Sequence, residues 1–569
     1  MKYKFWVFIA LMFSTFSIGA QDVDIKLSST YAIQNAHIIQ KPGKSIEKGT
    51  LIIKDGVIID VGTNVSIPAD AILVKGDSMY VYPGFIDAYN NIGEKKKEEK
   101  KNEEKIENPG NPPNDRAGIT PERSLSEVFD GGDKSIAEWR EAGFTASLSA
   151  PSDGMLPGKA SIIIHSGHDA SSSILKENMG TIGTFQSANR IYPATIIGVM
   201  AKYRDLFRQT SYAMKHESAY KANPIGMARP AYNKSLMALI PVVDKSQYLY
   251  MEAEKLKDIS HALTLQKDLG FNIALVNVKQ GGQYIDVIKS QKMPLVLSLD
   301  IPESKDKKDK EKDGDKKEKG EKEKDKKDED KEKKELDPEV EAMKVRRDKA
   351  IMEYQSQAAL FAKNGIEFGF SGKDIKGKDV KKNVKIMMEQ GITEDQILTS
   401  LTLTPAKMLG VSNVLGSLEK GKIANLFIAT APYFDEDSKI KYVFVEGEQF
   451  EYEVKKKKAK QEGKEGTITG LYACTIDVPG DQRNITISIA KSDDSYTLII
   501  ENEGDEKEID DFTIDGNRVS FPMEINEDGF TMKLKYDFTI DAGEIDGSVI
   551  AGEFGSFPLK GERTGDPKL

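Results

Sequence analysis

Cysteine is almost absent from this chain of 569 residues, and its rarity excludes several kinds of structure. The single Cys474 cannot form an intramolecular disulfide bond. It also cannot build a thiolate zinc site, which needs several Cys, or Cys together with His, at short spacing. We interpret Cys474 as a small buried hydrophobic residue. The chain has only 5 His, so imidazole ligands for a metal are scarce as well.

A clustered basic surface is missing too, because the formal net charge is -10 at pH 7. Recognition of nucleic-acid phosphates needs a clustered excess of Lys and Arg, so we do not expect nucleic acid as a partner. The sequence has no glycine-rich phosphate loop followed by Lys-Ser or Lys-Thr, and no Gly-x-Ser-x-Gly motif. These absences set aside nucleotide hydrolysis and serine hydrolysis.

The first residues predict export from the cytoplasm. Residues 1–20 begin with Lys2 and Lys4, continue with an apolar stretch and end at the small residues Gly19 and Ala20, which is typical of a secretory signal peptide. The apolar stretch is shorter than the roughly 20 residues that span a membrane. No Cys follows the expected cleavage site for lipid attachment. We therefore expect a secreted or periplasmic protein with no membrane span once the signal is removed.

After the signal segment, the pattern of expected secondary structure changes twice along the chain. Residues 28–81 contain short β segments, with Asp55-Gly56 between two apolar runs as a hairpin signal. Residues 82–410 then alternate apolar strands with helical patterns, which predicts parallel βα units in an α/β fold. Without its charged runs this region has the usual size of a TIM-like (β/α)8 barrel. Residues 411–455 again contain short β segments.

The C-terminal part is predicted to be a separate domain. Residues 454–466, VKKKKAKQEGKEG, are typical of a linker. Residues 467–569 contain alternating strands separated by Gly, Asp and Asn turns. This pattern predicts an all-β antiparallel domain, either a small up-and-down barrel or a sandwich.

Two charged runs interrupt the barrel region, near residues 94–107 and 303–335. Lys and acidic residues alternate in both, and apolar residues are nearly absent, so we expect disorder or a fluctuating exposed helix. Each run follows an apolar strand, and loops after barrel strands lie on the face where active sites form. The runs are either surface insertions without a role or a cover and partner-docking segment at the mouth of the barrel.

Three stretches of the sequence resemble the amidohydrolase superfamily, especially its imidazolonepropionase and prolidase-like branch. They are NAHIIQKPGKSIEKGTLIIKDGVIIDVG, VYPGFIDAYNNIG and LTLTPAKMLGVSNVLGSLEKGKIANLFIA. The resemblance covers about residues 28–455. It implies a (β/α)8 barrel with a small composite β domain made from residues 28–81 and 411–455, which flank the barrel.

The resemblance also implies a divalent metal, such as zinc, that activates water for attack on a carbon-nitrogen bond. Family ligands are a His-x-His after the first strand, His after the fifth and sixth strands, and Asp after the eighth. Here Tyr89 and Asn91 stand at the His-x-His positions. The segments FNIALVNVKQ and PLVLSLDIP, which we take as the fifth and sixth strands, contain no His. After the eighth strand Asp374 is close to the Asp position, but Ser371 or Gly372 is an alternative.

Other candidates come from residues that follow or end strands. His165 and His168 form an H-x-x-H after an apolar strand and are weak metal candidates. We also expect several polar residues at the pocket mouth: Asp87, Tyr89, Asn91, Glu252, Glu254, Asp300 and Ser371. The alternative interpretation is that these charged residues lie at the solvent-exposed rim of the barrel and bind no ligand.

Two functions follow from these observations. The first is an exported hydrolase acting on non-peptide or dipeptide carbon-nitrogen bonds, for which most metal ligands are missing. The second is a catalytically inactive barrel that binds a small molecule or a protein partner, because a fold alone does not confer a function.

Replacement of residues 303–335 by a short Gly-Ser linker should leave the thermal unfolding midpoint nearly unchanged. These residues carry almost no apolar side chains, so little buried surface is lost with them. Calorimetry of the deletion variant beside the full chain checks this. A large drop in midpoint, or strong amide protection across the run in hydrogen exchange, would contradict it.

Overall fold

The computed structural model describes residues 29–95, 106–302, 338–454 and 468–567, with two-residue gaps at 479–480, 493–494, 503–504, 528–529 and 553–554. It divides into two compact units, Met1–Lys455 and Lys456–Leu569. The predicted signal segment, the charged run 303–335, most of the run 94–107 and the linker after Val454 lie outside the described residues. Within the described parts, no helix is both long and apolar enough to cross a membrane.

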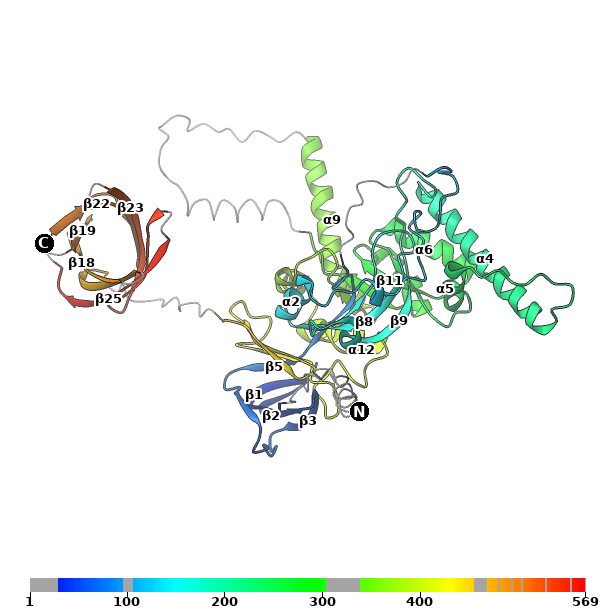
Figure 1. The fold of residues 1–569 in the computed structure, drawn as a ribbon, viewed down its shortest axis with the longest axis horizontal. Coiled ribbons are helices and arrows are strands. Elements are labelled where there is room, and N and C mark those ends of the chain that lie inside the picture. The colour runs from blue at the N-terminus through cyan, green and yellow to red at the C-terminus, as the bar shows by residue number, and fades with distance from the viewer. Residues whose placement is uncertain are drawn as a thin grey trace, which may run out of the picture. The chain divides into compact units, whose positions relative to one another are not determined.

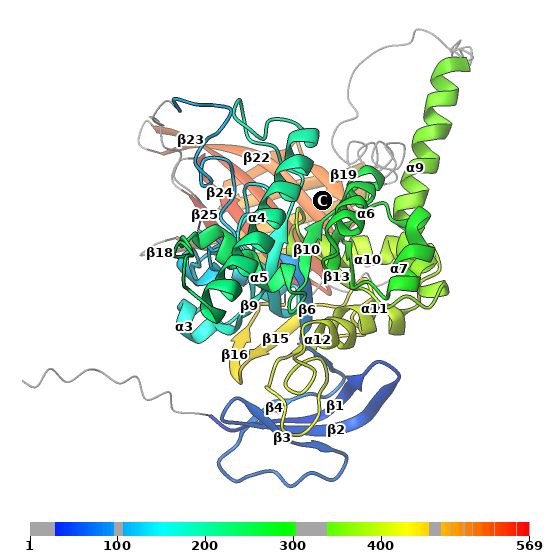
Figure 2. The ribbon, with the colours of Figure 1, turned by 90° about the vertical axis from the view of Figure 1, so that its right-hand side faces the viewer.

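One mixed sheet of the first unit combines strands from both flanks of the barrel (Figure 2). The strand order is β16-β15-β14-β5-β1-β2-β3, with β4 paired to β1. The bounds are β1 (Tyr31–Lys41), β2 (Lys44–Lys54), β3 (Val57–Gly62), β4 (Ile72–Lys75), β5 (Tyr80–Pro83), β14 (Leu426–Ala429), β15 (Ile440–Val445) and β16 (Glu448–Glu451). Its core therefore mixes early and late residues, such as Ile33, Leu51, Leu426 and Phe444.

The hairpin between β2 and β3 forms at the predicted dipeptide. Lys54 pairs with Val57, which leaves Asp55 and Gly56 as a two-residue turn. Their φ angles are 52° and 74°. Two positive φ angles define the type I′ turn, and Asp-Gly is among the few dipeptides that adopt it at little cost.

Eight strands form a nearly closed barrel in the sequence order β6 to β13. Their bounds are β6 (Phe85–Asn90), β7 (Phe144–Ser149), β8 (Lys159–Ile164), β9 (Ile174–Gly183), β10 (Leu249–Glu252), β11 (Ile273–Val278), β12 (Leu295–Ser298) and β13 (Gly369–Ser371). The last strand lies beside the first, where the Ser371 hydroxyl donates to the Tyr89 carbonyl oxygen at 2.7 Å.

Helices connect these strands and surround them (Figures 1 and 2). The α-helices are α2 (Lys134–Glu141), α3 (Ala170–Ser173), α4 (Ile196–Ala222), α5 (Lys234–Val243), α6 (Leu256–Leu269), α7 (Ile285–Gln291), α9 (Pro338–Lys363), α10 (Val380–Glu389), α11 (Glu394–Leu401) and α12 (Leu403–Met408). Short 3-10 helices are η1 (Leu125–Glu127), η2 (Gly282–Tyr284) and η3 (Gly377–Asp379).

The barrel departs from the predicted all-parallel arrangement at one strand. β8 pairs antiparallel with both β7 and β9, whereas the other neighbours in the barrel sheet pair in parallel. Residues 150–158 join β7 to β8 without a helix. A parallel return needs a crossover of a dozen or more residues, usually helical, so a connection this short turns the chain back.

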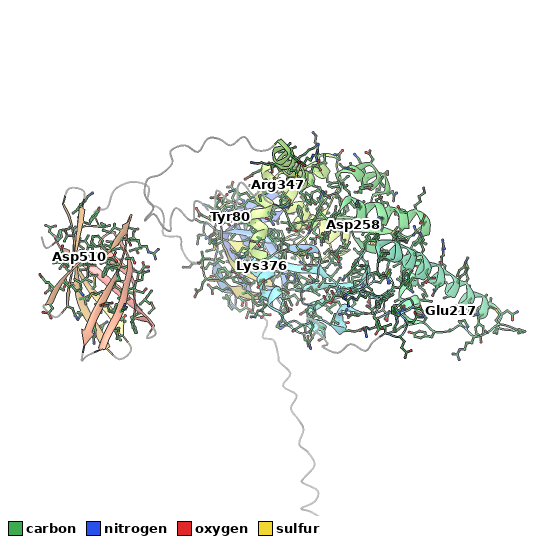
Figure 3. All side chains as sticks on the ribbon, turned by 90° about the horizontal axis from the view of Figure 1, so that it is seen from above. Tyr80, Glu217, Asp258, Arg347, Lys376 and Asp510 are labelled. Atoms are coloured by element: carbon green, nitrogen blue, oxygen red, sulfur yellow. The ribbon has the colours of Figure 1, made fainter. Side chains whose placement is uncertain are left out.

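The arm formed by α4 and the loop to α5 projects beyond the barrel, with Glu217 near its far end (Figures 1 and 3). α4 has 27 residues, but its buried residues all lie within Val199–Thr210. Farther along the arm, Tyr212, Ile225 and Tyr232 are 68%, 85% and 84% exposed. The arm therefore presents apolar side chains to solvent.

The second unit is a nine-stranded antiparallel sheet in the order β20-β19-β18-β17-β25-β24-β23-β22-β21. Its first and last strands, β17 and β25, are neighbours. Cys474 of β17 is buried here, as its interpretation as a buried hydrophobic residue predicts, and burial raises the pKa of its thiol to about 12. The bounds are β17 (Gly470–Val478), β18 (Asp481–Ser492), β19 (Ser495–Asn502), β20 (Asp505–Ile509), β21 (Thr513–Asp515), β22 (Arg518–Glu527), β23 (Phe530–Asp541), β24 (Glu544–Ile550) and β25 (Ser556–Gly565).

A glycine next to the last barrel strand makes room for α2. A Cβ atom on Gly372 would lie 1.8 Å from Cη2 of Trp139. The Trp139 ring in turn packs edge-on against Phe144 of β7, with ring centroids 4.6 Å apart. The indole thus connects α2, β7 and the residue that follows β13.

Substitution Gly372→Ala should lower the free energy of unfolding by about 1 to 3 kcal/mol, because the added methyl group overpacks this contact. Chemical denaturation of the variant measures the loss. The control is Gly62→Ala, whose new Cβ would meet only Val65 Cγ2, at 3.5 Å. Equal stabilities for the two variants would show that the Trp139 contact does not constrain the fold.

Candidate functional site

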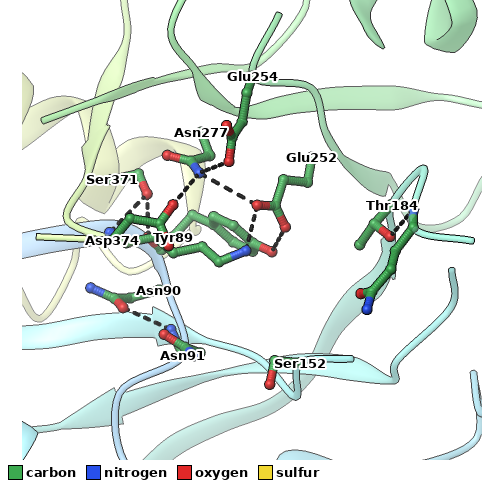
Figure 4. A network of polar contacts seen from close by, with 12 residues as sticks. Tyr89, Asn90, Asn91, Ser152, Thr184, Glu252, Glu254, Asn277, Ser371 and Asp374 are labelled. Atoms are coloured by element: carbon green, nitrogen blue, oxygen red, sulfur yellow. Dashed lines mark hydrogen bonds and ion pairs between the residues drawn. The ribbon is translucent and has the colours of Figure 1, made fainter. Parts of the chain in front are cut away.

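Polar side chains gather at the end of the barrel where its parallel strands finish (Figure 4). Tyr89 lies near the end of β6, Glu252 ends β10, and Asn277 is the penultimate residue of β11. Asp374 follows β13 closely. Because the carboxyl ends of parallel barrel strands meet on one face, these residues become neighbours despite their separation in sequence.

The Glu252 carboxylate binds two partners from opposite ends of the barrel sequence. The Tyr89 hydroxyl donates to Glu252 Oε2 at 3.0 Å. The Lys373 ammonium forms an ion pair with the other oxygen, Oε1. Lys373 Nζ also lies 5.7 Å from the centre of the Tyr89 ring, within range of a cation–π attraction. The three side chains therefore form one compact group.

Tyr89 is a neutral hydrogen-bond donor in this group. Burial raises the pKa of its phenol well above the usual value, and the nearby charge of Glu252 acts in the same direction. A phenol that stays protonated donates to a carboxylate and does not supply an anionic oxygen.

A second ammonium group, Lys279, joins three further carboxylates. Its Nζ lies 2.9 Å from Asp300 Oδ2, 3.4 Å from Glu254 Oε2 and 3.8 Å from Asp374 Oδ2. Burial alone would lower the pKa of Lys279, but the Asp300 hydrogen bond and the surrounding negative charge raise it above the usual value. Lys279 therefore stays charged at neutral pH.

Asn277 lies between the carboxylates and is completely buried. Its Nδ2 is 3.4 Å from Glu252 Oε1, 3.3 Å from Glu254 Oε1 and 3.4 Å from Asp374 Oδ2. Its Oδ1 is buried and has no hydrogen-bond partner among the residues that the structure describes. The residue has φ of 56°, a left-handed conformation that Asn tolerates better than most residues do. The amide nitrogen thus faces the three carboxylates, and the oxygen lies on the other side of the amide (Figure 4).

Asp87 holds the first strand against the last from inside the barrel. It is fully buried and accepts hydrogen bonds from Tyr89 N at 3.1 Å, Asn90 Nδ2 at 2.6 Å and Gly372 N at 3.2 Å. Burial raises the pKa of Asp87 to about 7, although the hydrogen bonds from Asn90, Gly372 and Tyr89 act to lower it. Asp87 lies below the mouth as an anchor between strands.

A model of the Amidohydrolase family matches residues 332–450 of the sequence. The structure is similar to that of an amidohydrolase from Thermotoga maritima MSB8, with a TM-score of 0.58 at 20% identity over 74% of this chain and 100% of the other. The matched segment of the chain therefore resembles the Amidohydrolase family. At this level of identity, the likeness to the Thermotoga protein shows the fold alone.

Two further solved structures are similar at lower scores. A prolidase complexed with N-methylphosphonate-L-proline is 14% identical over 75% of this chain and 100% of the other, with a TM-score of 0.41. A β-aspartyl dipeptidase from Fervidobacterium islandicum AW-1 is 12% identical over 74% and 96%, with a TM-score of 0.35. A comparison of the sequence with curated proteins finds no match.

The order of the barrel strands corrects the predicted strand count. Counted from β6, the fifth strand is β10 and the sixth is β11, so FNIALVNV is the sixth strand and PLVLSL the seventh. The assignment of these segments as fifth and sixth was wrong by one strand. The residues near the ends of the fifth and sixth strands are therefore Glu252 and Asn277, and neither is His.

The three remaining residues predicted at the mouth differ in burial and contacts. Asp300, after β12, joins the charged cluster through Lys279. Ser371 is buried and connects β13 to β6 through its hydrogen bond to the Tyr89 carbonyl. Asn91 is exposed, and its backbone N–H donates to Asn90 Oδ1 at 2.8 Å.

The prediction that His165 and His168 share a metal does not fit the structure. β8 runs antiparallel, so its last residue, Ile164, pairs with Ala146 near the start of β7, away from the mouth. His165 is fully buried, with Nε2 2.7 Å from Ser147 Oγ, and burial lowers its pKa to about 4. His168 Nε2 instead lies 2.9 Å from Glu448 Oε2 of β16.

The residues at the family's metal positions do not fit a divalent metal centre. Tyr89 is a neutral phenol, Asn91 is an exposed amide, and the cluster's carboxylates face the ammonium groups of Lys373 and Lys279. In the described parts of the chain, no group of three or more His, Cys, Asp and Glu side chains is arranged to hold a metal ion. No step of the function is therefore derived through a metal.

Sequence reasoning missed Asn277, Lys279 and Lys373. Asn277 carried a signal, because it is an amide inside the otherwise apolar segment IALVNV. A buried amide in a strand usually has a hydrogen-bond role. The two Lys carried no distinguishing signal among the many Lys of this sequence.

Asp87 should make part of the stability depend on pH. Its folded pKa of about 7 lies above the ordinary 3.8, so the folded state holds a proton that the unfolded state releases. The stabilising contribution is full below about pH 4 and is lost as the pH rises through about 7.

The stability difference between the wild type and Asp87→Asn should therefore be largest near pH 4 and shrink towards pH 7. Urea unfolding at a series of pH values measures it, with the exposed Asp77→Asn as control. A difference that stays constant across this pH range would contradict the raised pKa.

Proposed function

We propose that this chain is an exported amidohydrolase-fold protein that binds a small polar molecule at the mouth of its barrel without a catalytic metal. The match of residues 332–450 to the Amidohydrolase family favours a hydrolase. The resemblance of the sequence to the imidazolonepropionase and prolidase-like branch points to small ligands with amide or related carbon-nitrogen groups. The arrangement of Tyr89, Glu252 and Lys373 carries the proposal, because it places a phenol and an ammonium in the region of the metal ligands.

Metal-dependent hydrolysis needs a cation that lowers the pKa of a bound water. Zinc in catalytic sites is held by three protein ligands plus water, and these ligands are His, Cys or carboxylates. In this mouth, the ammonium groups of Lys373 and Lys279 form ion pairs with Glu252, Glu254 and Asp300, and so occupy carboxylates that could otherwise attract such a cation. An ammonium has no vacant orbital that could bind a water oxygen. It therefore supplies positive charge but does not lower the pKa of a water molecule as a bound metal does.

Export is the second part of the proposal. It rests on the signal pattern of residues 1–20, with Lys2 and Lys4 before an apolar stretch that ends at Gly19 and Ala20. A secreted or periplasmic location would give the mouth access to small molecules outside the cytoplasm.

The purified mature protein should hold less than about one zinc per chain after dialysis, because three ligands are needed and the mouth does not offer them. Added zinc should produce no hydrolysis of dipeptides or cyclic amides above the buffer rate. Metal analysis and a product assay measure both quantities, with an active amidohydrolase assayed in parallel.

The double variant Tyr89→His with Asn91→His serves as the matched test. It restores the His-x-His pair but leaves Glu252, Asn277 and Lys373 unchanged, so it too should remain inactive. Zinc-dependent turnover by the wild type, or by this variant at the rate of the active enzyme, would overturn the proposal.

A further inference from the structure

The outer part of the projecting arm, residues 211–233, carries large apolar side chains that face solvent. We call this segment the outer arm; Glu217 marks it in Figure 3. Tyr212, Ile225 and Tyr232 are each more than two-thirds exposed. One exposed apolar residue is ordinary on a protein surface, but three on one short projection are typical of an interaction site.

Ile225 stands at the tip of a tight turn. The Met227 N–H donates to the Pro224 carbonyl oxygen at 3.2 Å, which closes a β-turn over Ile225 and Gly226. Gly226 has φ of 74°, the left-handed conformation that a type II turn requires at this position. Small and polar residues dominate such turns, so the turn itself does not call for a β-branched apolar residue. The turn presents an aliphatic side chain outwards.

The loop of the outer arm is held against α4. His216 Nε2 lies 3.0 Å from the Ala228 carbonyl oxygen. His216 and Tyr212 are four residues apart on the helix, so they share one helix face. The loop therefore runs back along the face that carries Tyr212, and the outer arm is a folded projection.

The charge of the outer arm is opposite in sign to that of the chain. Its sequence has three cations, Lys215, Lys221 and Arg229, and one carboxylate, Glu217, so its formal charge is +2 with His216 neutral. The whole chain carries -10. All three cations are exposed, and Glu217 is paired with Lys221 at 2.8 Å. The outer arm is therefore a basic and apolar projection on an acidic protein.

Exposed cations beside apolar side chains match the surface of a bilayer that contains anionic lipids. Such a surface attracts Lys and Arg, while Tyr and aliphatic side chains enter the boundary between headgroups and acyl chains. A stable protein–protein contact needs a complementary patch of roughly 800 Å² on each partner. A fluid lipid surface accepts a projecting tip without a matching groove. The turn at Ile225 therefore favours a lipid surface over an acidic protein.

We propose that the outer arm docks on the surface of a bilayer containing anionic phospholipids. Ile225 and Tyr232 enter the boundary between headgroups and acyl chains, and Lys215 and Arg229 lie against lipid phosphates. This inference goes beyond the proposed function and does not depend on what the barrel mouth binds.

Cosedimentation of the purified full chain with vesicles tests the proposal. One set of vesicles is phosphatidylcholine alone, and the other mixes phosphatidylglycerol with it. Binding to the mixed vesicles should be at least about tenfold tighter, because each Lys or Arg near an anionic surface adds attraction. Two double variants, Ile225→Ser with Tyr232→Ser and Lys215→Gln with Arg229→Gln, should each weaken that binding by at least about tenfold.

Matched control variants change exposed residues of the same types in the composite sheet. Ile72→Ser with Leu73→Ser removes two exposed apolar side chains from β4. Lys54→Gln with Lys75→Gln removes two exposed ammonium groups. Both pairs should bind the mixed vesicles as the wild type does.

The variant Ile225→Trp reports entry into the lipid directly, and it does not depend on the folding of the double variants. Its fluorescence emission should shift to shorter wavelength when mixed vesicles are added, because the indole leaves water. The wild type, whose Trp139 is buried, is the blank. Soluble polyglutamate, which has negative charge but no apolar phase, should cause no such shift.

Equal binding to both kinds of vesicle, arm variants that bind like the wild type, control pairs that weaken binding as much as the arm variants, or an unchanged emission of Ile225→Trp would overturn the inference. Polyglutamate binding that depends equally on Ile225 and Tyr232 would indicate an acidic protein as the partner, and it would overturn the inference as well. The zinc and turnover assays of the barrel mouth are unaffected by any of these results.

Discussion

The buried carboxylate of Glu252 is the constraint on which the barrel mouth depends. Its side chain is only 12% exposed, and a carboxylate removed from water must be ion-paired or hydrogen-bonded. Its partners come from the first strand, through Tyr89, and from beyond the last strand, through Lys373. The hydrogen bond and the ion pair of Glu252 on β10 therefore also link β6 to the segment after β13, and these are the two ends of the barrel sheet that must meet for the barrel to close.

The composite sheet explains how the first barrel strand reaches its position. β5 of that sheet and β6 of the barrel are separated only by Gly84, whose N–H donates to the Asn425 carbonyl at 2.9 Å. A Cβ on Gly84 would lie 2.2 Å from Thr145 Oγ1, so no larger residue fits there without movement. The segment that follows the barrel in sequence, through Asn425, therefore fixes where β6 begins and thereby positions Tyr89.

Sequence patterns were sufficient where chemistry is local. Asp55-Gly56 specified its turn because few dipeptides adopt two positive φ angles. Tyr89, Glu252 and Asp300, chosen because they end or follow strands, take part in polar contacts in the structure. Patterns failed where the result depends on strand count and direction. Nothing in KASIII shows that β8 runs antiparallel, and the missed strand shifted the assigned sixth position by one. Asn277 is recognisable as a site residue only in the structure, where its Nδ2 faces three carboxylates.

The barrel mouth carries strong charges although Tyr89 and Asn91 stand where the resemblance places a His-x-His pair. In a metal site, carboxylates are retained because a divalent cation neutralises them; in this chain two ammonium groups take over part of that neutralisation. The exchange keeps the sign of the field, since four carboxylates still outnumber two ammonium groups. An ammonium can only donate hydrogen bonds, so the two Lys supply positive charge but cannot act as Lewis acids.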